Sequence, residues 1–254
     1  MAKTMRLDKL LGHTGWGTRR ELKELCKGGH VTVNGAVCRD SSQKIDPAAD
    51  AVAVDGQAVH YEASIYLMLY KPAGVVSATE DNVSPTVIGL LPRQYQGAGL
   101  FPVGRLDKDT TGLLLITNDG TWAHGITSPK KHTDKIYDAV VEGDIPEDVG
   151  DRFASGIVLD DGLHCLPAQA VQTGPRSLTV VVQEGKFHQV KRMCAAVGLK
   201  VVQLHRRSIG SVVLDDGLEP GQFRPLTDEE REALRSQSRG FAILSFQPVE
   251  NMVL

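Results

Sequence analysis

The sequence contains no apolar run of about 18 residues, so we expect no membrane-spanning helix. The basic residues near the N-terminus are not followed by the apolar segment of a secretory signal, which predicts a cytoplasmic location and no membrane partner. The 4 cysteines are scattered without a CxxC pair, and the histidines show no metal-like spacing. We therefore expect reduced, buried thiols and no metal site.

The net charge is also small, at -3, but the charge is sorted into patches. Residues 1–44 carry nine Lys or Arg against four Asp or Glu, a net charge of +5, so the remainder carries -8. Residues 186–207 hold six basic side chains and no acidic one. Such sorting favours a nucleic-acid partner, although solvated surface faces are the alternative interpretation.

The first 60 residues predict a small helix–helix–hairpin domain. Apolar side chains at helical spacing predict a short helix over 5–12, and Thr18 with Glu21 forms a capping box that starts a second helix. An Asn-Gly pair at 34–35, between two short apolar runs, predicts a hairpin with a type I′ turn. The second helix is expected to expose four basic side chains, those of Arg19, Arg20, Lys23 and Lys27.

The composition changes after about residue 60, and residues 64–236 predict a second domain. Strands are expected at 66–70, 113–117, 136–142, 157–159, 168–172, 178–183 and 211–214, and helices at 147–155, 188–197 and 227–236. Because strands and helices do not alternate regularly, we expect an α+β fold with a mixed, mostly antiparallel sheet and flanking helices. Residues 237–254 are left as a C-terminal tail without an assigned role.

Residues 104–112 (GRLDKDTTG) form a charged, glycine-flanked loop before an apolar strand, and this loop is the first candidate active site. Asp107 lies at its centre, where Arg105 and Lys108 would favour the ionised carboxylate. The alternative is that Asp107 is only a cap or a solubilising residue. Asp109, two residues further on, is expected to point away from Asp107, which argues against a two-carboxylate glycosidase pair.

Two further segments carry candidate chemistry. Residues 183–193 (QEGKFHQVKRM) predict a strand, a tight turn and a helix start, which could hold a phosphate or bring a basic side chain to Asp107. The alternative is a surface helix start. Tyr137 enters a predicted strand, where a core aromatic with a satisfied hydroxyl is the ordinary interpretation.

These segments, in this order, resemble known families. Residues 5–50, with RLDKLL, paired arginines and GHVTVNG, resemble the S4 RNA-binding domain. Residues 70–74 (YKPAG), the 104–120 block, Tyr137 and the 184–193 block are similar to the RsuA-type pseudouridine synthases, a resemblance that covers about residues 5–235. Stretches such as 126–129 and 222–227 look most like the small-subunit (16S) rRNA branch.

The resemblance implies roles for particular residues. Asp107 matches the essential catalytic aspartate, Tyr137 the tyrosine that stacks on the target base, and Lys191 the basic residue that pairs with the aspartate. Many relatives have Arg at this last position, so Lys191 departs from the common pattern. The remaining candidates are expected to contact RNA: Arg6, Arg19, Arg20, Lys23, Lys71, Arg105, Lys186, His188, Arg192 and Arg206.

The family's reaction isomerises a uridine to pseudouridine without redox change or an external group, so no cofactor is expected. The implied partner is ribosomal RNA or a pre-ribosomal particle, and we expect a monomer. Three alternatives stay open: a large-subunit (23S) rRNA target, a catalytically inert ribosome-assembly protein that binds RNA, and a hydrolase that uses Asp107.

Overall fold

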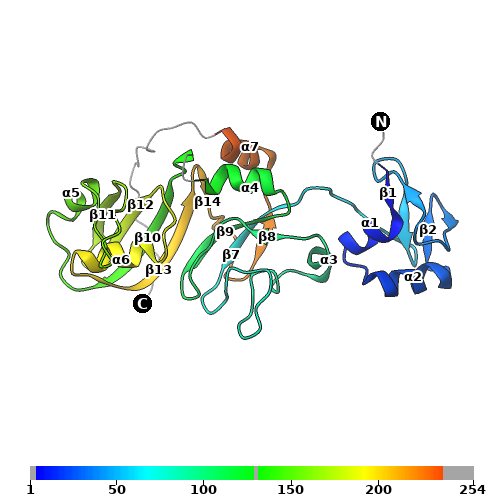
Figure 1. Ribbon diagram of the computed structural model, residues 1–254, viewed down its shortest axis with the longest axis horizontal. Coiled ribbons are helices and arrows are strands. Elements are labelled where there is room, and N and C mark those ends of the chain that lie inside the picture. Colours follow the sequence, from blue (N-terminus) through cyan, green and yellow to red (C-terminus); the bar gives the residue numbers. More distant parts are fainter. Residues whose placement is uncertain (1–3, 129–130, 237–254) are drawn as a thin grey trace. The chain divides into compact units, whose positions relative to one another are not determined.

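The computed structural model (Figure 1) describes residues 4–128 and 131–236. The chain forms two compact units. The first unit comprises residues up to Ile65 together with Ala78–Phe101, and the second comprises Tyr66–Ser77 and the residues from Pro102 onward. The sequence had placed 78–101 in the second domain. The tail predicted at 237–254 lies outside the described residues.

The first unit contains the predicted helices α1 (Leu7–His13) and α2 (Arg19–Gly28). The predicted capping box at the start of α2 is present, with Thr18 and Glu21 each accepting a hydrogen bond from the other's backbone N–H. A four-stranded sheet has the order β3-β2-β5-β6, and a separate pair joins β1 to β4. The bounds are β1 (Met5–Arg6), β2 (Val31–Val33), β3 (Ala36–Val37), β4 (Lys44–Ile45), β5 (Val52–Val54), β6 (Gln57–Ala58) and α3 (Arg93–Gln96).

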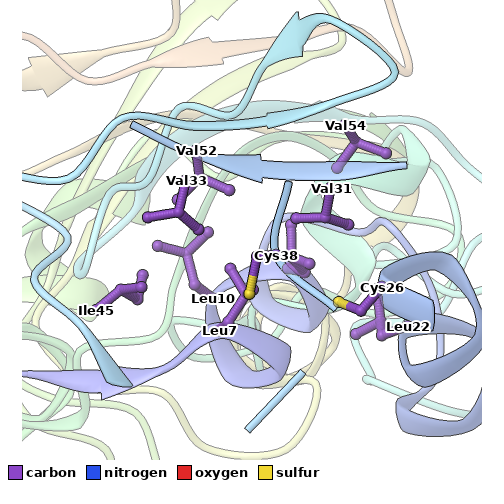
Figure 2. Packing of buried hydrophobic residues seen from close by; sticks show 11 residues of the cluster. Leu7, Leu10, Leu22, Cys26, Val31, Val33, Cys38, Ile45, Val52 and Val54 are labelled. Carbon is purple, nitrogen blue, oxygen red and sulfur yellow. The ribbon is translucent and has the colours of Figure 1, made fainter. Parts of the chain in front are cut away.

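An apolar core joins the two long helices of the first unit to its sheet, as Figure 2 shows. Leu7 and Leu10 of α1 and Leu22 of α2 are almost wholly buried beside the inward-facing valines of β2 and β5. Two of the four cysteines, Cys26 and Cys38, belong to this core as free thiols, and burial raises the pKa of Cys26 to about 11. Because α2 buries this face, its opposite face is left to charged side chains.

The second unit is built on a sheet with the order β11-β12-β10-β13-β9-β7-β15, to which β14 and β8 attach at β13 and β9. The strands of the main order and β14 pair antiparallel, except for a short parallel pairing of β13 with β9. The predicted mixed, mostly antiparallel α+β fold is therefore confirmed. The bounds are β7 (Tyr66–Lys71), β8 (Phe101–Pro102), β9 (Thr111–Thr117), β10 (Lys135–Glu142), β11 (Gln169–Gly174), β12 (Ser177–Val182), β13 (Lys200–Ile209), β14 (Val212–Val213) and β15 (Phe223–Pro225).

Helices flank this sheet. Figure 1 shows α4 (Gly120–Thr127) beside α7 (Asp228–Ser236), and the indole Nε1 of Trp122 donates to the Arg231 carbonyl at 3.3 Å. The predicted helices at 147–155 and 188–197 correspond to α5 (Val149–Ala154) and α6 (Gln189–Ala196). None of the described helices is both long and apolar enough to cross a membrane.

Three details of the second unit differ from the sequence prediction. The strand expected at 157–159 is only an isolated bridge between Val158 and His164. No helix was predicted after 118–119, but α4 begins there, because Asp119 caps its first backbone N–H groups and so makes the glycine that follows a helix start. The long strand β13 was not predicted, because its polar residues interrupt the apolar pattern.

Candidate active site

The loop that carries Asp107 is held from one side by the segment that follows β7. Ser77 Oγ donates to the Leu106 carbonyl at 2.9 Å and accepts from the Leu106 N–H at 3.0 Å. The Gly74 N–H donates to the Lys108 carbonyl at 2.7 Å. The backbone on both sides of Asp107 is thus fixed by bonds that leave its carboxylate free to face another element.

Lys71 completes this support from a fully buried position. Its Nζ donates to the carbonyls of Pro72, Lys108 and Thr110 at 2.9, 3.3 and 2.8 Å. Burial lowers the pKa of Lys71 to about 8, while the nearby carboxylates of Asp109 and Asp107 oppose the shift. The expected RNA contact by Lys71 is wrong for this structure, because a side chain with 0% exposure has no surface to offer.

Lys191 of α6 lies beside the loop that carries Asp107. Its Nζ lies 3.2 Å from Asp107 Oδ2 and 2.6 Å from Asp109 Oδ1. The hydrogen bond and charge of Lys191 hold the pKa of Asp109 below its usual value. The expectation that Asp109 points away from Asp107 is therefore corrected, since one ammonium group lies between both carboxylates.

His188 approaches Asp107 from the residue before α6. Its Nε2 is 3.5 Å from Asp107 Oδ1, and its backbone adopts the left-handed conformation with φ 49°. A left-handed backbone is uncommon for a residue with a side chain and costs of order 1–3 kcal/mol. The turn before α6 therefore places this imidazole beside the candidate catalytic carboxylate at a cost in folding free energy.

The turn itself is tied together by its own polar side chains. Glu184 pairs with Lys186, and its Oε2 accepts from Gln189 Nε2 at 3.1 Å and from the Leu166 N–H at 2.9 Å. Gln189 Oε1 in turn accepts from the Lys186 N–H at 3.0 Å. Lys186 was predicted to contact RNA, and the structure places its ammonium beside Glu184 within the turn.

Arg192 has a similar internal role. Its Nη2 lies 2.6 Å from Asp160 Oδ1 and 2.7 Å from Asp161 Oδ2, so it ties α6 to the 157–164 segment. These ion pairs hold the pKa of both carboxyls below the usual value. Arg192 was predicted to contact RNA, but the structure places its guanidinium on two acids of its own chain.

Tyr137 lies on β10 opposite Arg206 of β13, and Arg206 is in turn paired with Gly112 of β9. Arg206 is only 3% exposed: its Nε donates to the Leu113 carbonyl at 2.8 Å and its Nη1 to the Tyr137 hydroxyl at 3.4 Å. The expectation that Arg206 forms part of an RNA-binding surface is therefore wrong. Instead, its guanidinium lies among buried groups, where it contacts the hydroxyl of Tyr137.

Gly112 permits this arrangement. A Cβ at this position would lie 2.3 Å from the Arg206 carbonyl oxygen, and its φ of +107° is outside the range that side chains favour. The parallel contact of β9 with β13 thus requires glycine at this position. This contact brings the loop that carries Asp107 level with Tyr137 and Arg206. Three buried polar atoms of this region have no partner in the described residues: Thr110 Oγ1, Arg206 Nη2 and Ser208 Oγ.

The first unit presents the remaining candidates. Arg19, Arg20 and Lys23 are exposed on α2, as predicted from the apolar spacing. Arg6 is exposed too, but its guanidinium donates to Asp8 at 3.0 and 2.6 Å. In the second unit, Arg105 is exposed on the Asp107 loop. Among the described residues no group of three or more His, Cys, Asp or Glu could hold a metal ion.

Sequence reasoning found the two segments of this site but missed the support beneath them. Lys71 and Arg206 were both assigned to the RNA surface because charged side chains are seldom buried. Ser77 was not considered at all, because a single serine in a loop carries no pattern. The buried roles of these residues depend on backbone carbonyls of other segments, which no spacing in the sequence reveals.

Comparisons with known proteins show which proteins this chain is similar to. Residues 65–196 match the family described as RNA pseudouridylate synthase, and residues 5–52 match the S4 domain. The "Uncharacterized RNA pseudouridine synthase YtzG" of Bacillus subtilis is 46% identical over 235 residues, which cover 91% of this chain and 98% of the relative. The "Ribosomal small subunit pseudouridine synthase A" of Vibrio parahaemolyticus is 44% identical over 233 residues, which cover 91% and 99%. A solved structure described as "Crystal structure of pseudouridylate synthase" shares 38% identity with a TM-score of 0.65 over 91% of this chain and 99% of that one.

Proposed function

Because this chain belongs to the RNA pseudouridylate synthase family, we propose that it isomerises one uridine of small-subunit (16S) ribosomal RNA to pseudouridine. The target is supported by relatives named ribosomal small subunit pseudouridine synthase A, such as that of Escherichia coli, which is 41% identical over 89% of this chain. The reaction takes place on ribosomal RNA or a pre-ribosomal particle, and we propose a cytoplasmic monomer.

The position of Asp107 is the observation that carries this proposal. The reaction breaks the bond between uracil N1 and ribose C1′, turns the base, and joins C5 to C1′. A carboxylate can serve it in three ways: by attacking C1′, by removing the 2′ proton, or by adding to the uracil ring. In each case it must be accessible and held rigidly, and Asp107 is 27% exposed on a loop fixed by Lys71 and Ser77.

Lys191 assists by placing a positive charge 3.2 Å from the Asp107 carboxylate. Such an attraction is stronger in a partly buried site than in bulk water. Asp109 competes for the same ammonium at 2.6 Å, so the charge that Asp107 senses depends on where Asp109 lies. Asp109 is 74% exposed, and bound RNA would displace it more readily than Asp107.

The target uridine must leave its stack to reach Asp107, which costs a few kcal/mol. Stacking on Tyr137 would return about 1–3 kcal/mol. Tyr137 is 9% exposed and its hydroxyl accepts a hydrogen bond from Arg206, which restricts the ring before a base binds. The remaining free energy would come from phosphate contacts, for which the exposed basic face of α2 is the candidate.

Loss of Asp107 tests the chemistry. Asp107→Asn keeps the shape of the side chain but removes the nucleophile or base, so it should abolish tritium release from rRNA labelled at uracil C5 while RNA binding persists. Normal turnover in this variant would contradict the proposed catalytic role of Asp107. Mapping pseudouridines in the rRNA of a deletion strain identifies the target, and loss of a 23S rather than a 16S site would overturn the proposed substrate.

The proposed RNA-binding role of the first unit is tested separately. Reversing two exposed charges, Arg19→Glu with Arg20→Glu, should weaken RNA binding and flatten its dependence on salt, because fewer counterions are released. The rate of a single turnover at saturating RNA should stay unchanged. A fall in that rate with unaltered affinity would contradict the binding role of α2.

A further inference from the structure

We propose that Phe187 is a stacking platform for a base that neighbours the target uridine, an inference that rests on the proposed function. Phe187 is 74% exposed at the turn before α6. Among the described residues it is the one Phe, Tyr or Trp in the exposed class. Burying so large an apolar ring is ordinarily favourable, so an open ring at the rim of a catalytic site points to a ligand.

The ring is already half of a stack. Its centroid lies 3.8 Å from that of His188, with an angle of 19° between the two planes. His188 Nε2 in turn lies 3.5 Å from Asp107 Oδ1. The two rings therefore extend outward from the candidate catalytic carboxylate, and a planar group laid on the outer face of Phe187 would continue them.

The backbone holds these rings in place. His188 has the left-handed conformation, and the turn is fixed by Glu184 through Gln189 and the Leu166 N–H. A platform fixed in this way loses little conformational entropy when a base binds to it, which favours affinity.

The surroundings favour a base over a phosphate as the occupant. The three cations of the turn and of the start of α6 are paired within the chain: Lys186 with Glu184, Lys191 with Asp107 and Asp109, and Arg192 with Asp160 and Asp161. Apolar side chains are also exposed at this rim, since Leu163 and Leu166 are each 42% exposed on the segment bonded to the turn.

Base flipping makes a neighbouring base available to stack on Phe187. When the target uridine leaves the helical stack, each neighbouring base loses a stacking face. An aromatic side chain that lies beside the catalytic carboxylate can replace that face for either neighbour, and it does so with little regard to base identity. Phe187 thus helps to keep the RNA open after the uridine has entered the site.

The test measures the affinity of the full-length protein for a short RNA that contains the mapped uridine, with intact neighbours or with one neighbour made abasic. Phe187→Ala should weaken binding to intact RNA by roughly 5- to 150-fold, the range for loss of one stacked base. Phe187→Trp should bind at least as tightly as the wild type, and Phe187→Leu should resemble Phe187→Ala. The matched control is Val171→Ala, which removes an exposed apolar side chain from the edge strand β11 and should leave affinity unchanged.

Abasic RNA separates stacking from other contacts. The penalty of Phe187→Ala should disappear when the base on one particular side of the uridine is missing. An unchanged affinity in Phe187→Ala would overturn the proposal, as would a penalty that persists on both abasic RNAs. A defect seen only with ribosomal particles would instead indicate a protein contact and would also refute it. Tritium release by the wild type decides the proposed function independently of these results.

Discussion

Replacement of Lys71 by methionine probes the support beneath the catalytic loop. Burial lowers the pKa of Lys71 from 10.5 to about 8, and keeping the side chain charged at neutral pH therefore costs about 3 kcal/mol. Against this, each hydrogen bond from a charged donor contributes about 1.5–3 kcal/mol, and Lys71 makes three to backbone carbonyls. Lys71→Met should therefore destabilise the second unit by about 3 kcal/mol net, because bonds and desolvation partly cancel.

The same substitution should slow the chemical step. Without Lys71, the carbonyls of Lys108 and Thr110 lose their shared donor and the Asp107 loop can shift. A misplacement of about 1 Å at a reacting group can cost on the order of 100-fold in rate. Single turnovers at saturating RNA, measured well below the unfolding midpoint of the variant, report this loss. Lys200→Met is the matched control, since that side chain is 75% exposed and, among the described residues, forms an ion pair with Glu142 alone.

The pH dependence gives a second measurement of the same effect. The folded-state pKa of Lys71 lies below its unfolded value, so between about pH 8 and 10.5 the unfolded chain binds more protons. The stability of the wild type relative to Lys71→Met should therefore rise with pH across this window and be constant below it. Lys135, whose pKa burial also lowers to about 8, is common to both proteins and cancels in the difference. Urea unfolding at several pH values gives this difference; a flat profile, or a normal single-turnover rate in the variant, would refute the supporting role of Lys71.

Three further substitutions test separate parts of the structure. Gly112→Ala should lower the midpoint of urea unfolding and the yield of active enzyme, because its Cβ would meet the Arg206 backbone; an unaltered midpoint would contradict the close strand pairing. Thr18→Ala should destabilise the first unit by about 1 kcal/mol through loss of the α2 cap that it shares with Glu21, as measured by circular dichroism on heating, whereas equal melting would argue against the cap. Lys191→Arg should retain turnover and Lys191→Gln should lose most of it, and equal rates in the two would remove the need for a charge at this position.

Local signals in the sequence predicted local structure well. The capping box at Thr18 and the Asn34–Gly35 turn, with φ of 53° and 80°, both follow from chemistry within a few residues of the chain. The second domain was predicted only as a class, because sheet order depends on which strands meet. The parallel contact of β9 with β13 joins segments about ninety residues apart and depends on Gly112, whose requirement becomes visible only beside Arg206.

Asp109 was recognised as the second acid of the loop that carries Asp107, but the predicted direction of its side chain was wrong. In an extended strand only neighbouring side chains point to opposite sides, so residues two apart, such as Asp107 and Asp109, lie on the same side and the predicted opposite directions were wrong even for an extended segment. The loop is not extended there, since the Thr110 N–H donates to the Asp107 carbonyl at 3.1 Å and closes a turn. Within this turn both carboxylates reach Lys191. The ammonium is then shared, and Asp109→Asn should strengthen the pairing of Lys191 with Asp107 and not disturb the loop. The variant should therefore keep its single-turnover rate or exceed it, and a loss as deep as that of Asp107→Asn would show that Asp109 itself takes part in the chemistry.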